Sequence, residues 1–131
     1  MIPVPVKSEL MGAAKLADWK PVMAEQDVRE DQINRASVQE LRFILLKDAG
    51  DIFAYRDKCP HEQYPLSKGE LSEGVIICAR HLWEFEIRTG QHITRVPMVE
   101  RNLLRYPVRV VNGQVEIDVS SPKRWGENDG R

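Results

Sequence analysis

Cys59-Pro60-His61 and Cys78-Ala79-Arg80-His81 are the two short runs that decide the fold of this 131-residue chain. Sixteen residues separate His61 from Cys78, so the pattern is C-x-H, sixteen residues, C-x-x-H. The chain has only two cysteines and three histidines. The two runs therefore use every cysteine and two of the three histidines, and each run offers one sulfur and one nitrogen donor.

Cys59, His61, Cys78 and His81 form a donor set that suits a [2Fe–2S] cluster, in which two cysteines hold one iron and two histidines hold the other. A zinc site uses the same four donors, but its cysteines and its histidines usually come as separate pairs. A disulfide between Cys59 and Cys78 would leave both histidines without a purpose. The mixed runs favour the cluster, and colour distinguishes a red-brown iron–sulfur protein from a colourless zinc protein.

Length and composition indicate a single domain spanning residues 1–131 that binds neither nucleic acid nor a membrane. The formal net charge is −1, with 30% charged residues of both signs, and no helix-turn-helix or basic patch is visible. No apolar run approaches the length of a membrane span, and the first residues lack the apolar core of a signal peptide. With both cysteines assigned to the metal, none remains for a structural disulfide, which is typical of a reducing compartment. We therefore expect a cytoplasmic protein.

The rest of the sequence predicts an all-β domain made of short strands and turns. We expect an N-terminal arm at residues 1–18, a core at 19–119 with cluster-binding loops at about 57–98, and a polar, mobile tail at 120–131. Strands are expected at residues 19–23, 32–36, 42–47, 52–55, 74–77, 83–87, 106–110 and 115–119. The last two are joined by Asn112-Gly113, the preferred pair of a type I′ turn.

Four residues outside the donor set carry further expectations. Ser8 is expected to cap a short helix in the arm. Pro97 is expected to close over the cluster, and His92, which follows a turn, to be a solvated surface residue. Trp125, an aromatic residue in a polar tail, is expected to pack back on the body of the domain.

The sequence around the ligand runs resembles the Rieske ferredoxin family, over roughly residues 19–119. The chain is most similar to the ferredoxin component of toluene-monooxygenase-type systems in two stretches, CPHEQYPLSKGELSEGVIICARHLWEF and RTGQHI. The shared elements are C-P-H, L-S-x-G, E-G-V-I-x-C and H-L-W-x-F. This resemblance implies the Rieske fold, with stacked antiparallel sheets and a small cluster-binding subdomain formed by two hairpin loops.

The same resemblance implies an electron carrier rather than an enzyme, with one [2Fe–2S] cluster per chain. Such a carrier is a monomer that takes single electrons from an NADH-dependent flavoprotein or iron–sulfur reductase. It passes them to the diiron hydroxylase of a monooxygenase system in aromatic hydrocarbon catabolism. The ferredoxins of aromatic-ring dioxygenases share the sixteen-residue spacing and are the alternative, although Trp83 after His81-Leu82 favours the monooxygenase branch. A catalytic oxygenase subunit also carries a mononuclear-iron domain, for which this chain has no room.

The chain differs from the high-potential Rieske proteins of cytochrome bc complexes in ways that predict its potential. Those proteins have a further cysteine in each loop, joined as a disulfide, and this chain does not. Their second loop has a serine and a tyrosine that donate hydrogen bonds to sulfur, where this chain has Trp83 and Phe85. Fewer donors stabilise the reduced cluster less. The potential is therefore expected at the low end of the Rieske range, at about −150 mV.

Overall fold

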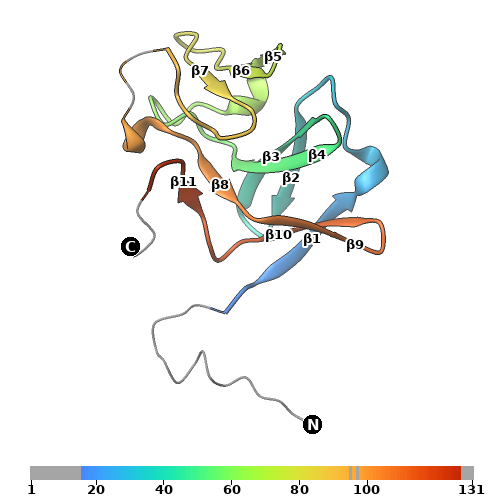
Figure 1. Cartoon of the computed structure of the whole chain (residues 1–131). Helices are drawn as coiled ribbons and strands as arrows, with labels where there is room; N and C mark the ends of the chain where they lie inside the picture. Colours follow the sequence, from blue (N-terminus) through green and yellow to red (C-terminus); the bar gives the residue numbers. More distant parts are fainter. Residues whose placement is uncertain (1–15, 95, 97, 128–131) are drawn as a thin grey trace.

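The computed structural model describes residues 16–94, 96 and 98–127, which form an all-β protein (Figure 1). The strands of these ranges are β1 (Trp19–Ala24), β2 (Asn34–Val38), β3 (Leu41–Asp48), β4 (Asp51–Arg56), β5 (Glu70–Ser72), β6 (Val75–Ile77), β7 (Glu84–Glu86), β8 (Leu104–Tyr106), β9 (Val108–Val111), β10 (Gln114–Asp118) and β11 (Lys123–Arg124). The helices are short 3₁₀ turns, η1 (Glu25–Asp27), η2 (Leu66–Lys68) and η3 (Val99–Arg101). The all-β prediction is confirmed. No helix in the described ranges has the length and apolarity needed to cross a bilayer.

Three antiparallel sheets divide the strands between a body and a smaller subdomain. The largest sheet has the order β11-β8-β4-β3-β2, the second β1-β10-β9 and the third β5-β6-β7. Figure 1 shows the third sheet at the top of the molecule and the second sheet below the largest one. The first ligand run lies between β4 and β5, and the second joins β6 to β7. Both runs therefore belong to the subdomain of the third sheet.

Strand β3 is buried on both faces because each face packs into a different hydrophobic core. Side chains alternate between the faces of a strand, and Ile44 and Leu46 enter one core while Phe43 and Leu45 enter the other. All four are fully buried. The continuous apolar run of the sequence is thus the strand that both cores share.

Two-residue turns fix the register of two hairpins. Asn112 and Gly113 have φ angles of 52° and 78°, which are the left-handed values that a type I′ turn needs. Gln114 consequently pairs with Val111, as the sequence predicts. The β3–β4 turn follows the same pattern at Ala49-Gly50, with φ angles of 53° and 87°.

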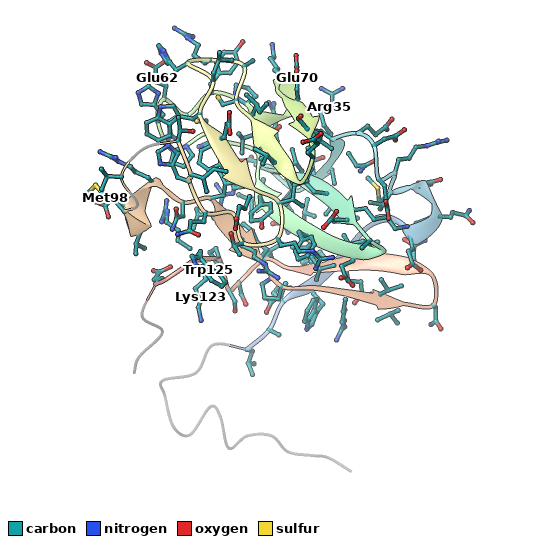
Figure 2. The ribbon with its side chains drawn as sticks, turned by 45° about the horizontal axis from the view of Figure 1, so that its top comes forward. Arg35, Glu62, Glu70, Met98, Lys123 and Trp125 are labelled. Carbon is teal, nitrogen blue, oxygen red and sulfur yellow. The ribbon has the colours of Figure 1, made fainter. Side chains whose placement is uncertain are left out.

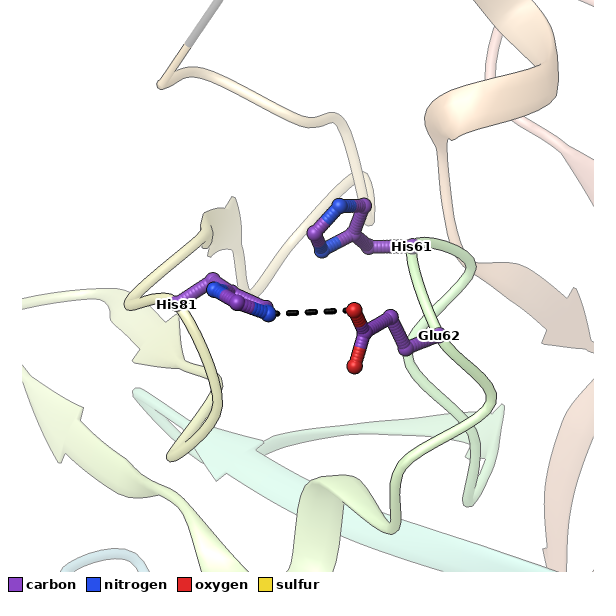
Figure 3. Close-up of side chains that lie close together, drawn as sticks. All are labelled: His61, Glu62 and His81. Atoms are coloured by element: carbon purple, nitrogen blue, oxygen red, sulfur yellow. Dashed lines mark hydrogen bonds and ion pairs between the residues drawn. The ribbon is translucent and has the colours of Figure 1, made fainter.

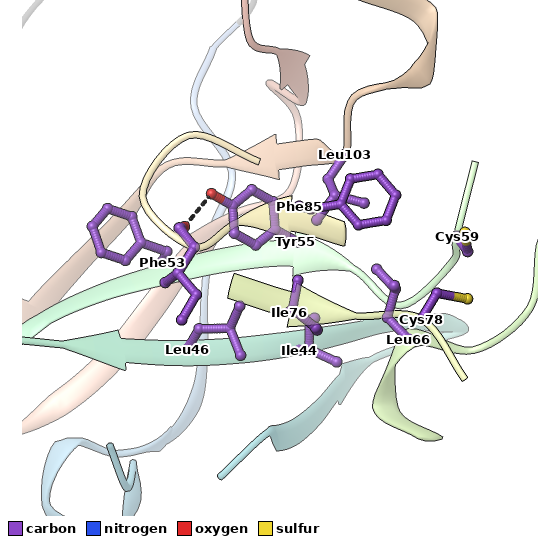
Figure 4. Close-up of a cluster of buried hydrophobic side chains, with 11 residues drawn as sticks. Ile44, Leu46, Phe53, Tyr55, Cys59, Leu66, Ile76, Cys78, Phe85 and Leu103 are labelled. Carbon is purple, nitrogen blue, oxygen red and sulfur yellow. Dashed lines mark hydrogen bonds between the residues drawn. The ribbon is translucent and has the colours of Figure 1, made fainter. Parts of the chain in front are cut away.

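The core nearest the ligand runs joins the subdomain to the largest sheet. It contains side chains from β3, β4, β6 and β7 and both cysteines (Figure 4). Its buried members are Ile44, Leu46, Phe53, Tyr55, Cys59, Leu66, Ile76, Cys78, Phe85, Ile87 and Leu103. The loops that carry the ligand runs are therefore fixed to a rigid, packed base.

Three expectations need correction, and one lies outside the described residues. The strand predicted at residues 106–110 is wrong, because β8 ends at Tyr106 and β9 begins at Val108 in a different sheet, with Pro107, which has no backbone N–H to donate, between them. The prediction of a mobile tail from residue 120 is wrong for its first half, because β11 pairs with β8 and Asn102 donates a 2.9 Å hydrogen bond to the Trp125 carbonyl. The second strand begins at Asn34 rather than at residue 32, since the Asn34 side chain bonds the Arg29 and Leu45 carbonyls and ends the preceding turn. The helix predicted after Ser8 lies outside the described ranges.

Candidate metal centre

The first ligand run lies on a tight loop that begins after β4. The Cys59 N–H donates a 2.7 Å hydrogen bond to the Tyr64 carbonyl, which closes the loop. The Asp57 carboxylate accepts a 2.7 Å bond from the Ser67 N–H and ties the loop to η2. As a result the Cys59 side chain points into the core, whereas His61, two residues further, is exposed.

The second ligand run turns sharply between β6 and β7. The Cys78 N–H donates a 2.8 Å hydrogen bond to the Trp83 carbonyl. His81 and Leu82 have φ angles of 69° and 58°, and such left-handed backbone at non-glycine residues costs of the order of 1–3 kcal/mol each. Strained backbone of this kind persists where the surrounding structure holds it and gathers at functional sites. Here it leaves Cys78 fully buried and His81 exposed.

The two thiols meet inside the core that joins the subdomain to the body. Cys59 and Cys78 are neighbours within side-chain hydrogen-bonding reach, at one end of the buried cluster (Figure 4). Burial raises the pKa of the Cys59 thiol to about 12, and the neighbouring Cys78 adds to this effect. A cysteine binds metal as a thiolate. A bound iron ion would supply the positive charge that favours the deprotonated form here.

The two imidazoles meet at the surface beyond the thiols. The ring centroids of His61 and His81 are 4.8 Å apart, with the rings inclined by 72°. Nε2 of His81 lies 3.1 Å from the Glu62 carboxylate (Figure 3). Figure 2 shows Glu62 at the outer edge of the molecule. With Nε2 of His81 engaged in this way, its Nδ1 is the ring nitrogen left for a metal.

With Glu62, the exposed part of the site forms a second candidate set of metal ligands. Donor atoms of His61, Glu62 and His81 all lie within 4.8 Å of one another. Two histidines and one carboxylate also suit a mononuclear metal ion. The spacing of cysteines and histidines gives no sign of this arrangement, although Glu62 directly follows His61 and belongs to the same loop.

A groove opens beside the exposed imidazoles, with a volume of about 630 Å³. It is lined by Pro60, His61, His81, Trp83, Glu100 and Arg101. Around it the surface mixes apolar and charged groups. Leu82 and Val96 are 64% and 71% exposed, and Arg80 lies 3.5 Å from the Glu62 carboxylate. Exposed apolar side chains around a groove are typical of a surface that contacts a partner.

The prediction that His92 is a solvated surface residue is wrong. His92 is fully buried, with its ring stacked on Trp83 at a centroid distance of 4.0 Å. The hairpin register explains this position, because the turn after β7 pairs Phe85 with His92. Directly opposed residues of an antiparallel pair share a face, so His92 lies on the inward face with Phe85. The Thr89-Gly90 turn in the sequence was the signal that could have predicted this register.

The other expectations have mixed outcomes. Trp125 contacts the body through its carbonyl oxygen, as described above, while its side chain remains 48% exposed. Trp83, at a position where the high-potential proteins have a hydrogen-bond donor, stacks its ring on His61, with centroids 4.4 Å apart and planes inclined by 12°. Pro97 lies outside the described residues, so its predicted place over the cluster stays a prediction.

The residues present fit a [2Fe–2S] cluster with mixed ligands. Two buried thiols lie side by side, two imidazoles lie side by side nearer the solvent, and each loop contributes one of each kind. A cluster with two cysteines on one iron and two histidines on the other needs this separation of sulfur from nitrogen. A single tetrahedral zinc ion does not require its sulfur donors to be separated from its nitrogen donors in this way.

Comparison with known proteins identifies the family. Residues 18–112 match the model of the Rieske [2Fe-2S] domain. The chain is 30% identical to the anthranilate 1,2-dioxygenase ferredoxin subunit of Burkholderia cepacia, over 83% of this chain and 99% of the relative. It is 32% identical to the alkene monooxygenase ferredoxin component of Xanthobacter autotrophicus, over 84% of this chain and 88% of the relative.

Solved structures agree with this assignment. The chain is similar to a structure titled as the complex of reduced oxygenase and oxidized ferredoxin in carbazole 1,9a-dioxygenase, with a TM-score of 0.66 and 28% identity, over 76% of this chain and 92% of that one. It shares its fold with a ferredoxin of Sphingomonas yanoikuyae, with a TM-score of 0.68 and 20% identity, over 77% of this chain and 98% of that one. The predicted Rieske fold and [2Fe–2S] cofactor are thereby confirmed. This chain belongs to the Rieske [2Fe–2S] ferredoxins of bacterial oxygenase systems.

Proposed function

We propose that Cys59 and Cys78 hold one iron of the cluster and that His61 and His81 hold the other. The observation that carries this proposal is the separation of the buried thiols from the exposed imidazoles on two converging loops. When bound, the cluster supplies a one-electron redox couple. The protein shields the sulfur-ligated side within its core and presents the imidazole edges to the solvent, where a partner can approach closely.

The function that this arrangement supports best is electron transfer to an oxygenase. The chain takes single electrons from an NADH-dependent flavoprotein or iron–sulfur reductase and delivers them to the oxygenase component. The relatives named as ferredoxin components of oxygenase systems support this role, as does the structure titled as an oxygenase–ferredoxin complex. We further propose that it acts as a single-domain monomer in the cytoplasm, without catalytic groups of its own.

We propose a diiron monooxygenase as the specific oxygenase, on the basis of Trp83 in the run His81-Leu82-Trp83. An aromatic-ring dioxygenase is the second candidate, since relatives of both kinds are about equally similar, at 32% and 30% identity. The expected potential of about −150 mV suits either partner. Phe85, which is fully buried and has no donor, supports a potential at this low end.

The docking face is the surface around the exposed imidazoles. It includes Pro60, Glu62, Gln63, Arg80, Leu82 and Trp83. Pro97, which the sequence also assigns to this face, lies outside the described residues. Complexes that transfer electrons are typically small and short-lived. An exposed apolar residue such as Leu82 provides contact area, and the neighbouring charges of Glu62 and Arg80 set the association rate.

Reconstitution tests the proposed function directly. The purified protein is reduced with an NADH-dependent reductase and mixed with a diiron hydroxylase or with a ring-hydroxylating dioxygenase. We expect a red protein with a Rieske electron paramagnetic resonance (EPR) signal that loses its electron rapidly to the monooxygenase component. Faster transfer to the dioxygenase would assign the second system. A colourless or redox-inactive protein would overturn the electron-transfer role itself.

A further inference from the structure

Trp83 lies between two imidazoles of different kinds, one exposed and one buried. Its ring stacks on His61 with a centroid distance of 4.4 Å and on His92 with a centroid distance of 4.0 Å, at interplanar angles of 12° and 27°. Two imidazoles side by side on one face of an indole would not fit within these distances. The three rings therefore form a column from His61 at the surface to His92 in the interior.

The inner end of this column is fixed more firmly than the outer end. His92 is fully buried, and its backbone bridges to Phe85. The backbone N–H of His92 also donates a 2.8 Å hydrogen bond to the side chain of Asn102, which is itself buried, and this bond fixes the position of His92 further. The ring of Phe85 lies 5.5 Å from the His92 ring. Trp83 and His61, in contrast, reach the surface.

From this column we infer that His92 is a positioning residue for the cluster ligand His61, acting through Trp83. The inference rests on the proposed ligand set. The fixed His92 ring supports one face of the indole, and the other face of the indole restricts rotation of the His61 ring. The stack also covers one face of His61 against water. The column thus sets both the orientation of this ligand and its access to solvent.

His81 provides an internal reference, because it meets His61 edge to face and has no stacking contact with Trp83 among the described residues. Loss of the column therefore removes a stacking contact from His61 and none from His81, so the larger change is expected at His61. Water that reaches His61 stabilises the reduced cluster, which carries one more negative charge than the oxidised form. Loss of the column consequently raises the midpoint potential.

The test compares His92→Leu, which fills much of the site without a ring, with His92→Phe, which restores an aromatic face. Pulsed EPR measures the nitrogen hyperfine couplings of the two histidine ligands, and voltammetry measures the midpoint potential. We expect His92→Leu to change one of the two couplings more than the other and to raise the potential, and His92→Phe to keep both at wild-type values. Equal changes in both variants, or no change in either, would overturn the inference.

A second variant that interrupts the column at another ring controls for a folding defect in the variant of the buried His92. Trp83→Leu removes the middle ring at a half-buried position and must reproduce the coupling change and the higher potential. If it leaves both unchanged, His92 does not act through Trp83. A wild-type protein without a Rieske EPR signal would instead contradict the proposed ligand set, so the two failures are distinguishable.

Discussion

The hydroxyl of Tyr55 donates a 2.6 Å hydrogen bond to the backbone carbonyl of Ile87, and this bond joins the largest sheet to the cluster-binding subdomain (Figure 4). Tyr55 lies on β4 and is fully buried, while Ile87 directly follows β7. Burial raises the pKa of Tyr55 far above its ordinary value, so the hydroxyl keeps its proton at any working pH.

Tyr55→Phe is expected to lower the free energy of unfolding by about 1–3 kcal/mol, because the Ile87 carbonyl loses its buried donor. Urea-induced unfolding followed by circular dichroism measures the change. Tyr64→Phe is the matched control, since the half-buried Tyr64 hydroxyl makes no hydrogen bond to the described part of the chain. Similar losses in both variants would contradict a specific role for the Tyr55 bond.

Gly90→Ala is expected to destabilise the protein more than Gly113→Ala. Both glycines have a φ angle of +78°, so the backbone strain of alanine is the same. A Cβ at Gly90 would lie 2.6 Å from Cε1 of Tyr55, whereas a Cβ at Gly113 meets nothing within 4 Å. Overpacking of this kind costs about 1–3 kcal/mol beyond the shared strain. Equal midpoints of thermal unfolding for the two variants would contradict this prediction and show that the backbone of the turn shifts to avoid the contact with Tyr55.

Asp118→Asn is expected to cost about 1 kcal/mol at pH 7, the difference between charged and neutral hydrogen bonds. Burial acts to raise the pKa of the Asp118 carboxyl, but bonds donated by the Asp18 N–H and by Ser120 outweigh it and hold the pKa below its ordinary 3.8. A lowered folded-state pKa stabilises the fold above the unfolded value, and this contribution is lost as pH falls through the folded value. The stability difference between wild type and variant must therefore shrink below about pH 4. Unfolding at several pH values checks this, and a constant difference would contradict it.

Cys59→Ser and Cys78→Ser are each expected to abolish cluster assembly, because the chain has no other thiol to replace the lost ligand. Iron content, colour and EPR spectra measure the loss. Glu62→Gln is the control, since Glu62 lies beside the histidines but outside the proposed ligand set, and it should keep the cluster. Loss of metal in Glu62→Gln together with retention in the cysteine variants would assign the metal to the exposed His61, Glu62 and His81 donors.

Arg80→Glu is expected to change the second-order rate of electron transfer to the oxygenase and its dependence on ionic strength. Charges at the rim of an interface act mainly on the association rate. Lys20→Glu makes the same change in net charge on β1, at the end of the molecule away from the proposed docking face (Figure 1). Stopped-flow mixing at several salt concentrations compares the two. If both variants show the same salt dependence, the docking face lies elsewhere.

Local signals in the chain were enough for the metal chemistry and for much of the strand pattern. The donor types and their spacing depend only on neighbouring residues, and so does the type I′ turn at Asn112-Gly113, which requires two left-handed residues. The apolar run of β3 and the alternation of β10 likewise reflect burial along a single strand. These features could be predicted because each residue's own conformation or polarity carries the information.

What the sequence by itself determined is therefore the ligand set we propose, the cofactor, and an all-β fold with its clearest hairpins. Only the tertiary structure decided that His92 is buried under Trp83, that Glu62 contacts His81, and that the tail adds strand β11 to the largest sheet. The Thr89-Gly90 turn was a local signal for the register of His92, but the polar or charged side chains of His92, Glu62 and the tail carry no local sign of these contacts. Their positions depend on strand register and on packing between segments that are distant in the chain, and these interactions exist only once the sheets have assembled.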